Sequence, residues 1–461
     1  MENPLRRIGI LGHVGATNLG DEAIIAAVIQ NLRERCPRAE LCAFTSNPQD
    51  TFERHGLPAF PLRRGSISIK GRQDPPRTHV PPPTVSGRLK DLLKRIPCIY
   101  SVLKAAAGSA GYAVGAVHEL MFLVSSYRHA KRLDLLIIAG SHQLNDFVGG
   151  PWAFPYTLLK WTVMARIAGA RVAVLSVGAG PIDSGWGKRF VRWTLALAYY
   201  RSYRDERSRD LVVKMGAAGE NLFVPDLAFS LTMPQIQSRP VSQEIIGINP
   251  LPFFDTWYWY RSDAQLYRDY VTKMARTAEF VIDNGYAVWL FPTQLRADPP
   301  VIEDVRRNMR ERYRHHLVNW RVQNFEDLAA GITSCRLVIA TRYHGILISL
   351  LLNTPVLALA YHGKSKDVME LLGQSKYALD AAAWDVRSLA DLFLQLDRER
   401  HQAAEQIALR LPSIRRTLAR QYDVLLGPIA SQPRREMIAS HRPESSPVAA
   451  GIRPPAEGAM E

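Results

Sequence analysis

The chain has 461 residues, a length that predicts about two domains and a tail. Hydrophobic residues make up 47% and charged residues 22% of the chain, the balance of a globular protein with full cores. The net charge of +15 favours polyanionic partners such as nucleic acid, anionic lipid or a phosphorylated substrate. The arginines are dispersed rather than gathered in a basic arm with interleaved aromatic residues, which argues against nucleic-acid binding.

Cysteine spacing and the lack of long apolar runs indicate the cellular compartment in which the protein is expected. The cysteines show neither a CxxC pair nor the spacing of a metal finger, so we expect reduced thiols and no metal site (Cys36, Cys42, Cys98 and Cys335). No apolar leader with a cleavage site precedes the first predicted strand, and no stretch of the sequence is long and apolar enough to span a bilayer. We therefore expect a cytoplasmic protein.

The N-terminal segment has the order strand, glycine loop, helix. A strand is predicted over Arg7–Leu11, and after a loop with several glycines a helix is predicted over Asp21–Arg35. The acidic pair at the start of this helix suits the helix dipole. Apolar residues recur along the helix at helical spacing: Ile24, Ile25, Val28, Ile29 and Leu32. This order is typical of the opening of a doubly wound α/β sheet.

The rest of the chain repeats this alternation in two halves. The first half contains predicted strands at 135–139 and 171–177 and predicted helices at 152–168 and 206–215. The second half contains strands at 245–249, 286–291, 337–340 and 356–360, and helices over 263–284, from Asn324 and after His344. A stretch without periodicity, 233–244, separates the halves. We predict Rossmann-like α/β domains over 1–235 and 236–385, followed by C-terminal helices over 386–427.

Two regions fall outside this plan. Residues 61–130 form an insertion with a Pro- and Arg-rich start, a basic segment and an uncharged Ala/Gly-rich run. This composition is consistent with a helical excursion packed on the first domain, or with a segment that lies on a membrane surface. Residues 428–461 are rich in Pro, Ser and Arg and contain few large apolar residues, so we predict a disordered tail there.

The glycine loop is the first candidate binding segment. Gly12, Gly15 and Gly20 lie between a strand and a helix, where free backbone N–H groups can approach an anion. Asn18 and Asp21 are placed to hold the loop or to bind sugar hydroxyls. The glycine spacing departs from the dinucleotide fingerprint, which disfavours a nicotinamide cofactor. Tight-turn glycines without a ligand remain an equally common interpretation of such a loop.

The second candidate segment follows the predicted strand 337–340. Arg342 and His344 stand at the carboxyl edge of that strand, where parallel sheets bind their ligands. Arginine offers a planar fork for carboxylate or phosphate, and histidine transfers protons near neutral pH. Beyond the next strand, Lys364 and Lys366 follow Tyr361 and His362 and add positive charge at the same edge. The combination of these residue types favours a catalytic site over a structural role for each residue.

These segments together resemble the polysaccharide pyruvyl transferase family. NLGDEAI after a glycine-rich turn resembles the family's N-terminal signature, and RYHGILISLLLNTPVLALAYHGKSKDVMELLG is similar to its C-terminal signature. Between them AGSHQLND, SVGAGPI, YRDERSRDL and VPDLAF occur in the family's order. The resemblance covers about residues 7–60 and 134–375. The chain departs from the family at Ala139-Gly140-Ser141, where three glycines are common, and at Tyr343, where leucine is frequent.

The resemblance implies a GT-B-like fold with the active site in the cleft between two domains. It also implies phosphoenolpyruvate as donor and a cyclic ketal on two sugar hydroxyls as product, with no cofactor. On this basis His344 is the candidate proton donor, Arg342, Arg204 and Lys364 would hold the donor, and Asp21 or Asp205 would orient or deprotonate a hydroxyl. The acceptor would be an exopolysaccharide, a cell-surface glycan or its lipid-linked precursor at the inner face of the membrane.

Other interpretations of the sequence remain open. Arg204 and Asp205 are equally consistent with a structural pair at the start of the helix from Glu206. A GT-B glycosyltransferase with a nucleotide-sugar donor would also use paired His and Arg residues. A non-catalytic relative that serves as a binding module in glycan assembly is the third possibility.

Overall fold

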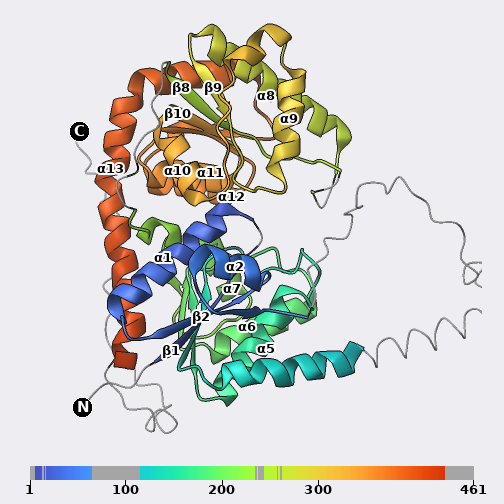
Figure 1. Cartoon of the computed structure of the whole chain (residues 1–461), viewed down its shortest axis with the longest axis vertical. Helices are drawn as coiled ribbons and strands as arrows, with labels where there is room; N and C mark the ends of the chain where they lie inside the picture. The colour runs from blue at the N-terminus through green and yellow to red at the C-terminus, as the bar shows by residue number, and fades with distance from the viewer. Residues whose placement is uncertain are drawn as a thin grey trace, which may run out of the picture.

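The computed structural model describes residues 6–12, 15, 17–64, 115–233, 236, 243–256, 258–259 and 262–430. Within them the strands form two separate sheets, and every strand pair within the sheets is parallel (Figure 1). Helices connect the strands and pack against both sheets (Figure 1). The predicted α/β fold with two Rossmann-like domains is confirmed.

The first sheet has seven strands in the order β3-β2-β1-β4-β5-β6-β7. They are β1 (Arg7–Leu11), β2 (Glu40–Thr45), β3 (Ala59–Pro61), β4 (Leu135–Ala139), β5 (Arg171–Leu175), β6 (Tyr200–Tyr203) and β7 (Leu222–Phe223). The described helices of this half include α1 (Leu19–Arg35), α2 (Pro48–His55), a helix over 115–130, α5 (Phe154–Ile167), α6 (Gly185–Leu197), α7 (Glu206–Lys214) and the 3-10 turn η1 (Leu227–Ser230). The chain order reverses between β1 and β4, so ligands are expected at the carboxyl ends of these strands.

The second sheet has five strands in the order β12-β11-β10-β8-β9. They are β8 (Ile245–Asn249), β9 (Ala287–Leu290), β10 (Cys335–Ala340), β11 (Val356–Ala360) and β12 (Ala378–Asp380). Around them lie α8 (Ala264–Asp283), α9 (Asp298–Asn308), η2 (Glu311–His316), α10 (Phe325–Thr333), α11 (Tyr343–Leu351), α12 (Gly363–Leu371) and η3 (Ser375–Tyr377). The reversal here falls between β8 and β10, directly before Arg342.

Side-chain caps account for where several helices begin. Asn18 accepts a hydrogen bond from the backbone of Gly20 and starts α1 two residues before the predicted position. Asp205 accepts from the backbone of Ser208 at the start of α7. Asn324, the predicted start of a helix, accepts from the backbone of Asp327 and caps α10. In each case the short polar side chain satisfies an N–H group that the helix itself cannot pair.

The two domains contact each other at the start of α1 and along α13 (Val386–Ala430). The backbone N–H of Leu19 donates to the carbonyl of Thr293 over 2.9 Å, and that of Leu295 donates to Thr17 over 2.9 Å. The 45 residues of α13 form one continuous helix that leaves the second domain and runs back along the first (Figure 1). There Tyr199 Oη donates to the Leu425 carbonyl over 2.7 Å. These contacts hold the carboxyl-end edges of the two sheets toward each other.

The predicted insertion and tail fall partly outside the described residues. Residues 115–130 form a helix that leads toward β4, whereas 65–114 are not described. Helix α13 carries helical backbone through Ala430, past the predicted start of the tail at 428, and 431–461 are not described. Among the described residues, none of the helices combines the length and apolar character needed to cross a bilayer.

Candidate active site

A cavity of about 520 Å³ lies where the two domains meet. Its walls come from the β6–α7 junction and η1 in the first domain, and from α11 and α12 in the second. Charged side chains dominate the lining, which is Arg204, Asp205, Glu206, Arg207, Asp210, Phe223, Asp226, Phe229, Tyr343, Lys364, Asp367, Val368, Glu370 and Leu371. A hollow of this size with convergent charged groups is typical of a site for a small polar ligand.

Arg204 is the buried cation at the floor of this cavity. One of its guanidinium nitrogens lies 3.3 Å from Asp226 Oδ2, and another lies 3.3 Å from His142 Nδ1. Asp205 Oδ2 is 3.7 Å from its Nε, and the guanidinium stacks 5.0 Å from the centre of the Tyr343 ring. Nε itself is buried and has no hydrogen-bond partner. Arg204 can therefore still donate a charged hydrogen bond to an anion in the cavity.

Lys364 approaches the same ring from the second domain. It stands in the first turn of α12, where His362 is the N-cap and accepts from the backbone N–H of Lys364. Its Nζ lies 5.0 Å from the centre of the Tyr343 ring, so two cations contact this ring. Burial, and then the charge of Arg204, lower the pKa of Lys364 to about 7. A bound anion would offset the charge of Arg204 and so raise the pKa of Lys364.

His344 faces the first domain across the cleft. It lies in the first turn of α11, and a Cβ atom added to Gly20 would come 2.0 Å from its Cγ. Burial lowers the pKa of His344 to about 4; Asp21 raises it, and Lys364 and Arg204 add to the lowering. Its Nε2 is buried without a hydrogen-bond partner. At neutral pH His344 is therefore an uncharged imidazole whose Nε2 has no hydrogen-bond partner.

The glycine loop brings Asp21 to this site and keeps its other groups occupied. Asp21 is buried in the first turn of α1 and accepts a hydrogen bond of 2.6 Å from Ser141 Oγ, which follows β4. Gly15, in a left-handed conformation at φ 77°, donates its N–H to Glu22 Oε1 over 3.1 Å. Gly12 donates to the carbonyl of Phe44 over 3.4 Å. The N–H groups of Gly12 and Gly15 thus hold the loop itself together.

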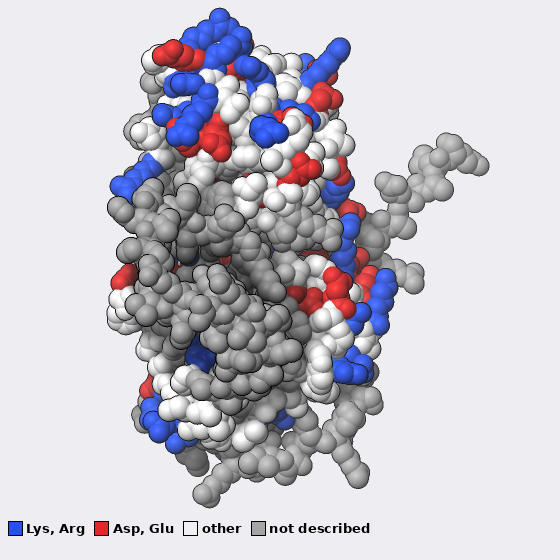
Figure 2. All heavy atoms as spheres, turned by 90° about the vertical axis from the view of Figure 1, so that its right-hand side faces the viewer, with Lys and Arg blue, Asp and Glu red and all other residues white. Residues whose placement is uncertain are grey.

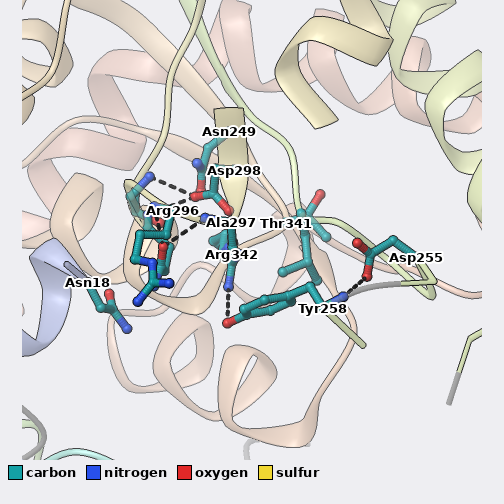
Figure 3. Close-up of polar contacts among 12 residues, drawn as sticks. Asn18, Asn249, Asp255, Tyr258, Arg296, Ala297, Asp298, Thr341 and Arg342 are labelled. Carbon is teal, nitrogen blue, oxygen red and sulfur yellow. Dashed lines mark hydrogen bonds and ion pairs between the residues drawn. The ribbon is translucent and has the colours of Figure 1, made fainter. Parts of the chain in front are cut away.

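Arg342 does not line the cavity and lies in a buried ion pair with Asp298 (Figure 3). Its Nε donates to Asp298 Oδ1 over 2.7 Å, and another guanidinium nitrogen is 3.4 Å from Tyr258 Oη. Asp298 Oδ2 accepts the backbone N–H groups of Thr293 and Gln294 over 2.9 and 2.8 Å. The 293–295 segment in turn pairs with the α1 loop. Arg342 therefore supports the backbone segment through which the second domain contacts the first.

Most of the residues proposed from the sequence come together here. Arg204, Asp205 and Lys364 line the cavity. His344 and Asp21 do not line it but act electrostatically on each other and on Lys364, and Gly20 lies against the His344 ring, while Asn18 caps α1. Lys366 does not join them, because it is exposed and pairs with Asp380 over 3.2 Å. The catalytic and binding roles of these residues stay predictions.

Sequence reasoning left three residues of the site without a role. Asp226 and Tyr343 lie inside the quoted segments VPDLAF and RYHG, and Tyr343 Oη donates to Asp226 Oδ2 over 3.3 Å. His142 lies in AGSHQLND, and burial lowers its pKa well below the ordinary value. Each of the three lies in one of the ordered motifs at a strand end, and this position is the sequence signal that could have identified it as a site residue.

The comparisons with known proteins concern both family and fold. A model of the polysaccharide pyruvyl transferase family matches residues 18–363. The S. aureus MnaA–UDP co-structure has a TM-score of 0.53 at 8% identity and covers 92% of this chain and 97% of that chain. UDP-GlcNAc 2-epimerase from Neisseria meningitidis, bound to UDP-GlcNAc, has a TM-score of 0.53 at 10% identity and covers 92% of this chain and 100% of that chain. A glycosyltransferase from Rickettsia africae has a TM-score of 0.51 at 8% identity and covers 94% of this chain and 100% of that chain. At such identities these structures show the fold alone, and they confirm its GT-B-like arrangement.

Proposed function

Because the chain belongs to the polysaccharide pyruvyl transferase family, we propose that it transfers the pyruvyl unit of phosphoenolpyruvate to a sugar, forming a cyclic ketal on two hydroxyls and releasing phosphate. The acceptor is a sugar of an exopolysaccharide or cell-surface glycan, or its lipid-linked precursor, and the reaction takes place in the cytoplasm. One observation carries this proposal: Arg204 and Lys364 approach one aromatic ring from opposite domains at an interdomain cavity, beside a buried histidine.

The donor is held by these two cations. Phosphoenolpyruvate carries a carboxylate and a phosphate, and a trianion needs several positive charges in a site from which water is excluded. The free Nε of Arg204 and the ammonium of Lys364 supply them. His142 beside Arg204 stays neutral, because burial and the charges of Lys364 and Arg204 lower its pKa. It therefore does not add to the repulsion among the cations.

His344 supplies the proton that starts the reaction. A bound trianion offsets the charges of Lys364 and Arg204 and so raises the pKa of His344 from about 4 toward neutrality. His344 then protonates the methylene carbon while the first sugar hydroxyl adds to the neighbouring carbon. The bond from that carbon to the phosphate oxygen breaks as the second hydroxyl adds. Of the two hydroxyl protons, one ends on the new methyl group by way of His344, and the other leaves with phosphate.

Carboxylates orient the acceptor. Asp21 acts electrostatically on His344 and accepts from Ser141, and its carboxylate is of the kind that orients a sugar hydroxyl by accepting from it. Asp205 at the cavity wall is the second candidate base, although its side chain already caps α7. Arg342 acts as a positioning residue, because its guanidinium is paired with Asp298 and does not line the cavity.

A donor screen tests the reaction. The purified protein is incubated with phosphoenolpyruvate, or with UDP-sugars, and with candidate polymeric or lipid-linked glycans, and phosphate release and the mass of the glycan are measured. Phosphate release with a ketal mass supports the proposal. Transfer from a UDP-sugar would identify a glycosyltransferase instead, and binding of glycan without turnover of any donor would identify a non-catalytic member.

A matched pair of lysine variants tests the donor site. Lys364→Met removes the cation that faces the cavity, and Lys366→Met removes a charge of the same kind two residues further along α12, where it pairs with exposed Asp380. In the first variant we expect the donor to bind at least about tenfold more weakly than in the wild type, since a charge-assisted hydrogen bond contributes about 1.5–3 kcal/mol. Binding in the second should equal that of the wild type. Equal losses in both would contradict the site.

A further inference from the structure

Two adjoining hollows lie on the first domain, away from the interdomain cavity. One hollow, of about 450 Å³, is lined by Arg63, Arg64, Glu119, Trp152, Tyr156, Thr157 and Lys160. The other, of about 460 Å³, is lined by Leu123, Val124, Tyr127, Tyr156, Leu159, Lys160, Val163 and Met164. Tyr156 and Lys160 belong to both, so a cationic hollow and an apolar hollow adjoin along α5.

The cationic hollow carries more positive charge than its own residues neutralise. Arg63, Arg64 and Lys160 face one carboxylate, Glu119, which Lys160 Nζ contacts over 2.8 Å. A side-chain nitrogen of Arg63, Nη1, is buried without a hydrogen-bond partner. Buried donors are normally paired, so this arrangement is suited to an anionic group such as a phosphate.

The neighbouring surface is apolar and aromatic. In the helix over 115–130 the side chains of Val117, Leu120, Met121 and Val124 recur at helical spacing and are 55–65% exposed. Trp152 is 59% exposed and lies 5.5 Å from the Tyr156 ring. Exposed apolar groups in a continuous patch of this kind mark an interaction surface on a protein.

The patch continues onto α6, where basic and aromatic side chains alternate. Trp186 and Trp193 are each 49% exposed, and Trp186 lies 6.3 Å from Trp152. Between them Lys188, Arg189 and Arg192 are exposed as well. Tryptophans with interspersed cations are typical of the interface between a bilayer and water, where the rings lie at headgroup level and the cations meet anionic lipids.

We propose that this face of the first domain binds an anionic membrane surface, and that the paired hollows accept the phosphate and the adjoining hydrocarbon of one membrane lipid. Arg63, Arg64 and Lys160 hold the phosphate, the groove between α5 and the 115–130 helix holds the chain, and the tryptophans lie in the headgroup layer. A symmetric contact with a second copy is disfavoured, because it would bring the α6 cations of both copies together. The inference concerns membrane binding and is independent of the donor.

Vesicle sedimentation tests the inference on the full-length protein. We expect the protein to bind vesicles of phosphatidylcholine with phosphatidylglycerol, and not vesicles of phosphatidylcholine alone. The double variant Arg63→Gln, Arg64→Gln should bind about tenfold or more weakly, since each basic residue near an anionic surface contributes about 1 kcal/mol. Equal binding by the double variant, or no vesicle binding by the wild type, would overturn the proposal.

Matched controls separate this site from general charge and from general hydrophobicity. Arg306→Gln, Arg307→Gln removes the same charge from α9, where both arginines pair with Glu303. On the face seen in Figure 2, the Lys and Arg side chains of the second domain lie among Asp and Glu side chains. Trp152→Ser, Trp186→Ser should weaken vesicle binding, whereas Leu409→Ser on α13, 79% exposed, should not.

Two further outcomes would assign the face to another ligand. If inorganic phosphate at millimolar concentration displaced the protein from vesicles, a free anion and not a lipid would be the ligand of the cationic hollow. If sedimentation velocity showed that Trp152→Ser, Trp186→Ser turns a dimer into a monomer, the face would be a contact between copies. Phosphate release with a soluble glycan acceptor should be unchanged in the Arg63, Arg64 variant, which separates membrane binding from catalysis.

Discussion

Gly20→Ala tests the contact on which the candidate active site depends. The added Cβ would lie 2.0 Å from His344 Cγ, 2.2 Å from Cδ2 and 2.5 Å from Nδ1. Ordinary contacts between such atoms are about 3.5–4 Å, so the ring and the start of α1 must separate by roughly 1–2 Å. Because His344 sits in the first turn of α11, this displacement opens the cleft or turns the imidazole away from the cavity.

The expected cost follows from that displacement. A misplacement of about 1 Å in a reacting group costs on the order of a hundredfold in rate, so phosphate release from phosphoenolpyruvate should fall by about that factor. The free energy of unfolding should also fall, by about 1–3 kcal/mol, because Gly20 is buried and the added methyl group overpacks its contact with His344. Nuclear magnetic resonance should show the pKa of His344 rising from about 4 toward its ordinary value as the ring becomes solvated.

Gly427→Ala is the matched control, since a Cβ there meets nothing within 4 Å and the residue lies in α13. It should leave both the rate and the pKa of His344 unchanged. If Gly20→Ala kept near-normal turnover and an unshifted His344, the α1 loop and α11 would not form one catalytic unit in solution.

Three further predictions concern single groups of the site. His344→Gln should lower turnover by roughly a hundredfold while donor binding, measured by calorimetry, persists; near-normal turnover would require another acid. Donor affinity should fall as pH rises through about 7, because Lys364, whose pKa is lowered to about 7, is cationic below that pH and neutral above it; in Lys364→Met this fall should be much smaller, and only the dependence from proton uptake by His344 should remain. Asp298→Ala leaves Arg342 buried without its partner and should lower the free energy of unfolding by about 3–5 kcal/mol, as measured by urea titration. An Arg342→Met, Asp298→Ala double variant should recover part of that loss, and no recovery would argue against the ion pair.

Local patterns were sufficient to predict the two-domain α/β fold and the strand ends that carry the site. Buried runs such as Leu135–Ala139 and Val356–Ala360 are apolar throughout because parallel strands are covered on both faces. Five strands escaped prediction, β2, β3, β6, β7 and β12. Four of them have only two to four residues, too few to show a periodicity. The motifs at the ends of β1 and β10 pointed to a site because parallel strands present their carboxyl ends at one edge.

Only the tertiary structure decided which of the proposed residues share one cavity. Lys364 and Lys366 stand two residues apart, yet α12 turns them roughly 200° from each other, so one faces the Tyr343 ring and the other pairs with Asp380. Arg342 looked like a donor ligand, whereas Asp298, 44 residues earlier in the chain, takes its guanidinium. Position 20 has no room for a side chain, because the His344 ring from the other domain lies against Gly20. Contacts between residues so distant in the chain depend on how the domains pack, and no local spacing encodes them.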